Sequence, residues 1–296
     1  MDWKSDRRLQ LRMLLALVLT LGGYAALLAV VFSVFSTAGA MVVLGLLAAF
    51  LVVSVSQADR IAYLATTAVA VDREKYPTLY EIVERLARQA DMSTPPIAVI
   101  PTDEPNALSA GTGDRTVICI TTGLLNALDG DELEAVLAHE LAHLKNNDSS
   151  VMTVAGFPTV VSGIALSMAG RTVSFNSFIY LGIGALWMVF YLVFVALPVY
   201  IASLPGTLVL SRYREYAADR GAVAITGDPV ALANALATLH DHPTPPDTDL
   251  RQVASFNAFC IVPTDTLFPL VATHPPVDRR IRKLRELMTE VESPGR

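Results

Sequence analysis

The chain has 296 residues, of which 53% are hydrophobic and only 17% are charged. Soluble globular proteins contain about 45–50% apolar and about 25% charged residues, so we expect part of this chain to lie in a lipid bilayer. The composition excludes intrinsic disorder, a coiled coil and a collagen-like fold. Two cysteines far apart in a long chain exclude a disulfide scaffold, and a net charge of −6 argues against a nucleic-acid partner.

The first predicted elements are two transmembrane helices. No charged residue occurs between Met13 and Ala58, and this stretch has room for two spans of about 20 residues each. We place the helices at Leu14–Phe35 and Met41–Val55, joined by the small residues Ser36, Thr37, Ala38 and Gly39. The alternative is a signal peptide cleaved near Ala38. The apolar region of a signal peptide has only about 7–15 residues, which favours two retained spans.

The next segment predicts a helix and a small sheet. Apolar residues at helical spacing cover Tyr76–Gln89, and the β-branched runs Ile97–Ile100 and Val117–Ile120 predict strands. Between the two strands, Asn106–Gly111 predicts an edge strand that leads into a turn at Gly111–Gly113.

A second pair of transmembrane helices is expected at Val151–Ala169 and Phe178–Leu204. Like the first pair, these segments are apolar around the whole helix, which favours lipid exposure over an amphipathic surface position. Two glycines and Pro158 interrupt the first of them. A buried or re-entrant helix at that position therefore remains an alternative.

The last part of the chain predicts three further helices, over Tyr213–Thr226, Pro229–Leu239 and Val277–Val291, with a proline-rich loop between the second and third. The predicted fold class is mainly α with a small β-sheet, in a polytopic membrane protein with four transmembrane helices. We expect four successive parts: helix pairs at 1–58 and 151–204, and the two halves of one soluble domain at 59–150 and 205–296.

The distribution of basic residues predicts the orientation of the chain in the membrane. Lysines and arginines cluster before the first span and after the second and fourth, and the turn at 36–39 has none. By the positive-inside rule, both termini and the two soluble parts face the cytoplasm. The predicted location is therefore the cytoplasmic (inner) membrane, with several passes and the soluble domain inside.

The stretch H-E-L-A-H is the most informative motif in the sequence. Asp129 and Glu132 form a capping box that opens a helix over Gly130–Lys145, and this helix carries His139 and His143 one turn apart on one face. That spacing allows both imidazoles to bind one Zn²⁺ ion. Glu140 lies one step round the helix, where it can act as the general base for a metal-activated water rather than as a ligand.

A catalytic zinc site needs a third protein ligand and an open fourth position. The best candidate for this ligand is Glu215, in the stretch R-E-Y-A-A-D. Asp219 lies one turn further on the same helix face, where it could accept a hydrogen bond from a ligand imidazole and fix its tautomer. Two solvated carboxylates are the alternative, but the pairing with an H-E-x-x-H helix favours the metal site.

The motifs together resemble a known family. The resemblance rests on H-E-L-A-H-L-K-N-N-D at His139–Asp148, R-E-Y-A-A-D at Arg214–Asp219, Asn106-Ala107 before a strand, and T-H-P-P-V-D-R-R-I at Thr273–Ile281. With its two helix pairs, the chain is similar to the HtpX-type membrane metalloproteases, gluzincins related to the CAAX prenyl endopeptidases. The resemblance implies a gluzincin-like protease domain with one Zn²⁺ per chain. It also implies an endopeptidase that faces the cytoplasm and degrades misfolded or damaged membrane proteins in quality control.

The resemblance also implies roles for residues outside the zinc motif. An edge strand at Asn106, Ala107, Leu108 and Ser109 would bind the substrate backbone by β-addition. His274 and Arg280 would stabilise the oxyanion of the tetrahedral intermediate. The alternatives are a turn residue before two prolines for His274 and a helix surface charge for Arg280. Relatives often have an aromatic residue in the stretch Asn106-Ala107-Leu108, and this difference implies a possible change in substrate preference.

Three other functions are weighed against this one. A scaffold that has lost its activity would lack Glu140 or one of the ligands, and all are present. A transporter would carry charged residues inside its spans, and the four predicted spans carry none. CAAX-type processing is the nearest catalytic alternative, although such enzymes usually have more than four spans. The sequence predicts peptide or membrane-protein substrates and a lipid bilayer as partners, but no oligomeric state.

The remaining candidate residues have simpler interpretations. His240 and His242 flank a proline-rich loop and are expected to be solvated rather than to bind a second metal, because no carboxylate or thiol lies at ligand spacing. Cys119 and Cys260 are expected in the core. Asp148 is expected to cap a helix or to form an ion pair at the membrane surface.

Overall fold

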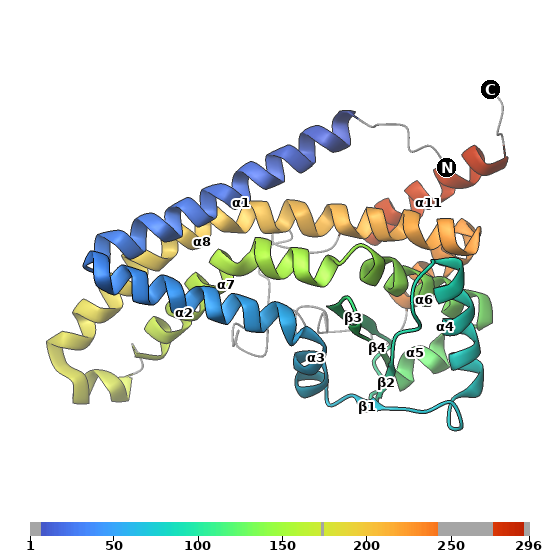
Figure 1. Ribbon diagram of the computed structural model, residues 1–296, viewed down its shortest axis with the longest axis horizontal. Helices are drawn as coiled ribbons and strands as arrows, with labels where there is room; N and C mark the ends of the chain where they lie inside the picture. Colours follow the sequence, from blue (N-terminus) through green and yellow to red (C-terminus); the bar gives the residue numbers. More distant parts are fainter. Residues whose placement is uncertain (1–6, 173–174, 242–274, 293–296) are drawn as a thin grey trace. The chain divides into compact units, whose positions relative to one another are not determined.

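The computed structural model describes residues 7–172, 175–241 and 275–292 (Figure 1). The chain divides into two compact units, which are described separately. Among the described residues, the helical unit comprises 7–53 and Met152–Ser211, apart from 173–174, and the mixed unit comprises Ser54–Val151, 212–241 and 275–292. The expected division into membrane and soluble functional parts stays a prediction.

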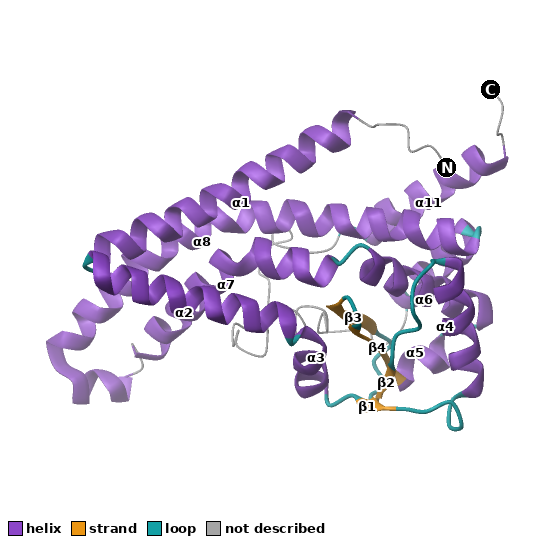
Figure 2. Cartoon of the chain, in the orientation of Figure 1, coloured by secondary structure: helices purple, strands orange, loops and turns teal. Residues whose placement is uncertain are grey.

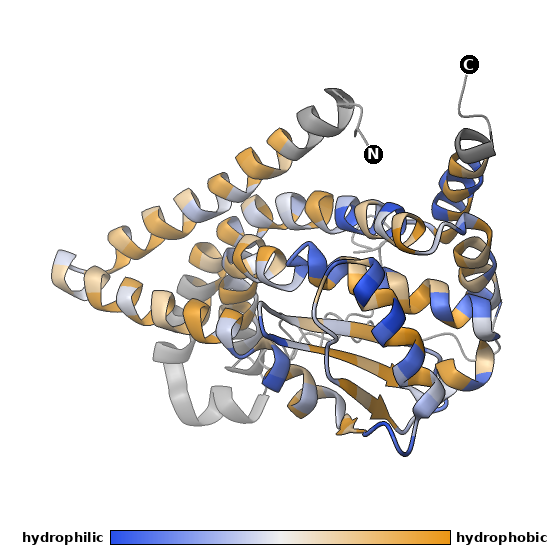
Figure 3. Cartoon of the chain, turned by 45° about the vertical axis from the view of Figure 1, so that its right-hand side comes forward, coloured by the Kyte–Doolittle hydropathy of each residue, from blue (hydrophilic) through white to orange (hydrophobic). Residues whose placement is uncertain are grey.

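The helical unit is built from helices long and apolar enough to cross a bilayer. Its helices are α1 (Arg7–Val34), α2 (Thr37–Ser56), α7 (Asp148–Thr172) and the first part of α8 (Phe175–Thr226). Each of the four contains a candidate span in the described part of the chain. In Figure 3, α1 and α2 are coloured mostly as hydrophobic, and the large apolar side chains that they expose include Leu21, Val42 and Leu46. The expected number of spans is confirmed.

The connection between α1 and α2 is shorter than expected. The sequence predicts a four-residue link through Gly39, but α2 begins at Thr37. The hydroxyl of Ser36 accepts a hydrogen bond from the backbone N–H of Gly39 at 3.3 Å. Serine stabilises the first turn of a helix in this way, so Thr37, Ala38 and Gly39 become part of the helix.

The last predicted span and the helix expected after it are one helix. Helix α8 has 52 residues and continues through Pro198 and Pro205 to Thr226, so the predicted end at Leu204 is wrong. Membrane helices tolerate proline where hydroxyl groups compensate for lost backbone hydrogen bonds. In α7, Pro158 leaves the carbonyl of Val154 without its helical donor, and the hydroxyl of Tyr24 on α1 donates to that carbonyl at 2.7 Å.

The mixed unit contains a four-stranded sheet, which is the one sheet of the described residues (Figure 2). The strands are β1 (Val69–Ala70), β2 (Ile97–Ile100), β3 (Ala107–Thr112) and β4 (Arg115–Thr121), in the order β1-β2-β4-β3. Strand β3 is antiparallel to β4 and lies at one edge, as the sequence predicts. The turn between them needs glycine, because Gly111 has φ +102° and an added Cβ would lie 1.8 Å from the carbonyl oxygen of Arg115.

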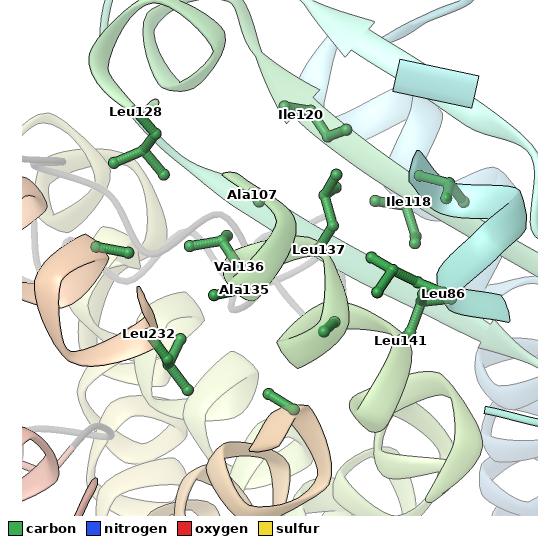
Figure 4. Close-up of a cluster of buried hydrophobic side chains, with 14 of the residues drawn as sticks. Leu86, Ala107, Ile118, Ile120, Leu128, Ala135, Val136, Leu137, Leu141 and Leu232 are labelled. Carbon is green, nitrogen blue, oxygen red and sulfur yellow. The ribbon is translucent and has the colours of Figure 1, made fainter. Parts of the chain in front are cut away.

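Helices surround one face of this sheet and form the core with it. They are α4 (Pro77–Gln89), α6 (Gly130–Lys145), α9 (Pro229–His240) and α11 (Val277–Glu292). Figure 4 shows part of this core, to which α6 contributes Val136, Leu137 and Leu141. The capping role of Asp129 is confirmed, since its carboxylate accepts from the N–H of Glu132 at 2.9 Å. Two short helices, α3 (Ala58–Thr66) and α5 (Thr122–Ala127), and the strand β1 were not predicted.

Candidate metal centre

Two helices bring the three predicted ligands together inside the mixed unit. Helix α6 is buried along the whole of its second half, so both imidazoles of its motif point into the protein. Glu215 lies on α8, is buried, and reaches the same place. The Nε2 atoms of His139 and His143 are 3.1 Å apart, and they lie 3.7 and 3.5 Å from the carboxylate oxygens of Glu215.

These separations fit a single metal ion. Ligand atoms at about 2.0–2.1 Å from a tetrahedral Zn²⁺ are about 3.3 Å from one another. The three measured separations lie on either side of this value. Two neutral imidazole nitrogens and a carboxylate oxygen are also the donor set of many catalytic zinc sites. The residues therefore fit a divalent metal ion with one position left open.

The carboxylate of Asp219 lies next to the imidazole of His139, and the guanidinium of Arg280 binds this carboxylate. Its Nδ1 atom lies 3.1 Å from Oδ1 of Asp219, although without the alignment of a regular hydrogen bond. Arg280 binds both oxygens of Asp219, with Nε at 2.9 Å and Nη2 at 2.5 Å, and its Nη1 atom is 3.2 Å from Glu215. The buried Arg280 is therefore not the surface charge that was the alternative interpretation.

A second carboxylate supports His143. Oδ2 of the buried Asp148 lies 2.6 Å from Nδ1 of this imidazole, and its Oδ1 lies 3.4 Å from Nε of Arg214. When Nε2 of His143 faces a metal, Nδ1 carries the hydrogen and donates it to Asp148, which fixes the tautomer. The sequence predicts an ion pair or a cap at Asp148 but not this contact. The signal that could have found it is a carboxylate at the start of the next helix, five residues after the second histidine.

The charges around the site favour a divalent cation. Four carboxylates are buried here, those of Glu140, Asp148, Glu215 and Asp219, and two guanidiniums, those of Arg214 and Arg280, lie among them. When both imidazoles are neutral, this set has a net charge of −2. Buried charges are stable only when they are paired or coordinate a metal, so an ion of charge +2 completes the balance.

The carboxylates also raise the proton affinity of the first ligand. Burial lowers the pKa of His139, but the nearby carboxylates of Asp219 and Glu215 outweigh burial, so this pKa lies above its ordinary value. A metal ion must displace the proton from His139 before it can bind there. Metal binding at this site therefore competes with protons.

The predicted general base is fixed by the edge strand. Glu140 is fully buried, and its Oε2 atom accepts a hydrogen bond of 2.8 Å from the hydroxyl of Ser109 on β3. The alternation of side chains along β3 places Ala107 on the same face as Ser109. Leu108 points to the other face, where it packs with Ala98 and Cys119. The N–H of Thr121 donates to the carbonyl of Asn106, so Leu108, two residues on, also directs its backbone groups to β4, and the backbone groups of Ala107 and Ser109 face the edge.

A cavity of about 350 Å³ opens beside the predicted ligands. His139 and Glu140 line one side of it together with Asn106, Ala107 and Arg280. The remaining wall is mostly apolar and comes from α5, α6, α9 and α11. The structure thus gathers His139 and Glu140 of the H-E-L-A-H motif, part of the edge strand and Arg280 around one space.

The histidines and cysteines outside the metal centre can be compared with their predicted positions only where the structure describes them. His274, His242 and Cys260 lie outside the described residues. His240 is exposed, as expected. Cys119 is buried in the sheet, as expected for a core residue, and burial raises the pKa of its thiol to about 12.

Comparisons with known proteins agree with this geometry. The model of "Peptidase family M48" matches residues 73–288. "Protease HtpX homolog 1" of Streptomyces coelicolor is 39% identical, over 99% of this chain and 97% of the relative. "Protease HtpX homolog 2" of Methanosarcina mazei is 35% identical over 98% of both chains. The crystal structure of S. mikatae Ste24p has a similar fold, with a TM-score of 0.51 and 19% identity over 94% of this chain and 67% of that one.

Proposed function

The chain belongs to peptidase family M48 and is a multi-pass membrane metalloprotease, and we propose that it is a zinc endopeptidase that cleaves misfolded or damaged membrane proteins. The observation that carries the proposal is the arrangement of His139, His143 and Glu215, whose ligand atoms lie within 4.8 Å of one another beside the buried Glu140. Zinc is the metal that best suits two imidazoles, one carboxylate and an open position.

Each residue has a distinct part in the proposed reaction. His139, His143 and Glu215 would hold the metal ion, which would supply Lewis-acid polarisation of the peptide carbonyl and of the attacking water. Glu140 accepts the proton from the attacking water and passes it to the amine that leaves. Asp219 and Asp148 keep the two imidazoles in the tautomer that leaves Nε2 free for the metal.

The proposed substrate contacts are the backbone of β3 and the positive charge of Arg280. In the described part of the chain β3 is the outermost strand of the sheet, and its backbone N–H and C=O groups would bind an extended peptide as a further strand. Arg280 lines the cavity next to Glu140, where its guanidinium can stabilise negative charge on the carbonyl oxygen. His274 is proposed to stabilise the same negative charge. The basic residues that flank the spans support a site that faces the cytoplasm.

Proteolysis by the purified full-length protein in detergent tests this function. The protein is stripped of metal with a chelator, reloaded with one equivalent of Zn²⁺, and mixed with an unfolded membrane protein. We expect cleavage only after reloading, and we expect Glu140→Gln to bind zinc but to cleave at least about a hundredfold more slowly, because the general base is lost.

The matched control is Asp131→Asn, which removes an exposed carboxylate from the first turn of the same helix. This variant should cleave at the rate of the parent protein. Cleavage that survives both chelation and Glu140→Gln would show that another group, or a contaminating protease, is responsible.

A further inference from the structure

A serine hydroxyl lies on the face of the sheet that packs against the metal-binding helix α6. Ser109 of β3 is on this face, opposite Ile118 of β4. Its neighbours on the face belong to the main core, part of which Figure 4 shows, and they are Ala107, Ile118 and Ile120. Ser109 interrupts this apolar pattern. Because an unpaired hydroxyl is costly in such surroundings, the side chain needs a polar partner.

The partner of this hydroxyl is the proposed general base. Ser109 donates a hydrogen bond of 2.8 Å to Oε2 of Glu140, which is 31 residues further along the chain. The two residues belong to different elements, so the contact depends on the packing of β3 against α6. Hydrogen bonds to an ionised carboxylate are shorter and stronger than those between neutral groups. This bond is therefore suited to hold Glu140 in one orientation.

The orientation of the Glu140 carboxylate matters for the reaction. The last torsion of a glutamate side chain has broad minima, so the carboxylate can turn unless a neighbour holds it. A general base must point at the proton that it accepts, and a small misplacement of a catalytic group can cost about a hundredfold in rate. An ionised carboxylate has about four acceptor sites. The bond from Ser109 thus orients Glu140 and leaves its capacity to accept a proton.

The backbone groups of Ser109 face a different direction from its side chain. They lie at the edge of the sheet, whereas those of Leu108 face β4. In the proposed function, a substrate peptide adds along this edge as a further strand. Ser109 would therefore contact the peptide through its backbone and the general base through its hydroxyl. Glu140 lines the cavity beside the metal ligands and Ser109 does not, so the hydroxyl would act on the reaction through Glu140.

We propose that Ser109 is a positioning residue, which aligns the carboxylate of Glu140 with the peptide bond of a substrate bound along β3. The inference rests on the proposed function, because it takes Glu140 as the general base and β3 as the strand that binds the substrate. It gives the side chain of Ser109 a task separate from that of its backbone. Loss of the hydroxyl should therefore slow the chemical step and leave peptide binding in place.

Steady-state kinetics of the zinc-loaded full-length protein test this role. The substrate is a quenched fluorescent peptide that copies a cleavage site mapped in the unfolded membrane protein. Ser109→Ala should lower kcat about five- to fiftyfold, because the base is present but no longer aligned. KM should stay within about twofold of the parent value, because the backbone of β3 is unchanged. Ser109→Thr keeps a hydroxyl and suits a strand, so it should restore most of the rate.

The matched control is Thr116→Ala. Thr116 is partly buried, as Ser109 is, and lies on the same face of the sheet in the neighbouring strand β4. This variant also removes a hydroxyl, but not one that contacts Glu140. It should keep both kinetic constants of the parent. Zinc affinity, measured by competition with a chelator, should be the same in Ser109→Ala, Thr116→Ala and the parent.

A double variant distinguishes positioning from a general effect on the fold. Glu140→Gln has no base to align, so the addition of Ser109→Ala should slow its residual cleavage by less than about twofold. Mass spectrometry after long incubation measures this slow cleavage. A hydroxyl that only stabilised the strand would slow the parent and the Glu140→Gln protein by the same factor.

The outcomes separate this inference from the proposed function. If the parent protein binds zinc but cleaves nothing, the proposed function is wrong and the role of Ser109 with it. If the parent cleaves but Ser109→Ala has unchanged constants, or differs only in KM, the positioning role alone is overturned. The same conclusion follows if Ser109→Thr is as slow as Ser109→Ala, or if Ser109→Ala slows the Glu140→Gln protein as much as it slows the parent.

Discussion

The two predicted histidine ligands each lie next to an aspartate that contacts an arginine, but the shorter contact of this aspartate is with the arginine at one site and with the histidine at the other. Next to His139, Arg280 donates hydrogen bonds to both carboxylate oxygens of Asp219. Asp219 itself lies 3.1 Å from Nδ1 of the imidazole, without the alignment of a hydrogen bond. Next to His143, Oδ2 of Asp148 lies 2.6 Å from Nδ1 of the imidazole. Nε of Arg214 lies 3.4 Å from the other oxygen of Asp148. The side chain of Arg214 is also more exposed than that of Arg280, 16% against 9%.

Because of this difference, we expect Arg280 with Asp219 and Asp148 with Arg214 to have different effects on the protein. The Arg280 side joins three elements of the mixed unit, since Asp219 and Glu215 lie on α8, His139 on α6 and Arg280 on α11. Its main effect should be on the stability of the fold around the site. The Asp148 side acts on one imidazole through one strong hydrogen bond, so its main effect should be on the metal.

The largest expected effect is that of Arg280→Ala on stability. Removal of one partner from a buried ion pair costs about 3–5 kcal/mol, because the remaining charge stays buried. Here two carboxylates, of Asp219 and Glu215, lose their partner. Thermal unfolding of the metal-free protein in detergent should show a large loss, and bound zinc should reduce it. Arg282→Ala, an exposed arginine on the same helix, should change little.

The next effect distinguishes the two carboxylates by metal affinity. Loss of a carboxylate that orients a ligand histidine weakens metal binding by about 10–100-fold, so Asp148→Ala and Asp219→Ala should both fall in this range. Asparagine should rescue the two sites unequally. At Asp148 its oxygen can still accept from His143, whereas at Asp219 it cannot form the two charged contacts with Arg280. Competition with a chelator measures these affinities, and equal rescue at both positions would contradict the comparison.

A smaller effect is expected from pH. The raised pKa of His139 means that the metal-free protein keeps a proton there to a higher pH than an isolated histidine would. This protonation stabilises the metal-free fold at low pH, and the stabilisation is lost as the pH rises through the raised pKa. Metal affinity should change in the opposite direction and decrease as the pH falls through the same range. Chelator competition at a series of pH values checks this, and an affinity that is independent of pH would exclude a titrating His139.

The smallest effect is expected for an ion pair on the surface that, like Arg280 and Asp219, is formed through two nitrogens of an arginine. Arg85 binds Glu134 through two nitrogens at 2.6 Å each, but its side chain is 45% exposed. Exposed pairs contribute only about 0.2–1 kcal/mol, so Arg85→Ala should lower the unfolding temperature far less than Arg280→Ala does. Similar losses for the two variants would mean that burial does not explain the role of Arg280.

The sequence predicts those features that depend on local pattern. H-E-x-x-H, the cap at Asp129 and the turn signal at Gly111–Gly113 each act over a few residues, so α6 and the edge strand follow directly from the pattern. The pairing of α6 with Glu215 is not local, and the need of a zinc site for a third ligand indicates it together with the family resemblance. The described ligand residues lie together, whereas their roles in binding zinc remain predictions.

Other features could not be predicted, because they depend on contacts between distant segments. Helix α8 continues through Pro205 although proline usually ends a helix, so the local pattern predicts the end of this helix wrongly. The contact between Asp148 and His143 depends on how tightly the chain turns between α6 and α7, and its single positive φ at Asn147 has no strong sequence signal. The short strand β1 is too brief to show a period.

Titration of the metal-free protein with zinc tests the central claim most directly. Peptide hydrolysis should rise in proportion to added Zn²⁺ and stop rising at one equivalent per chain, and Glu215→Ala should abolish both tight binding and hydrolysis. Hydrolysis without zinc, saturation at another ratio, or tight zinc binding that persists in Glu215→Ala would contradict a site formed by His139, His143 and Glu215.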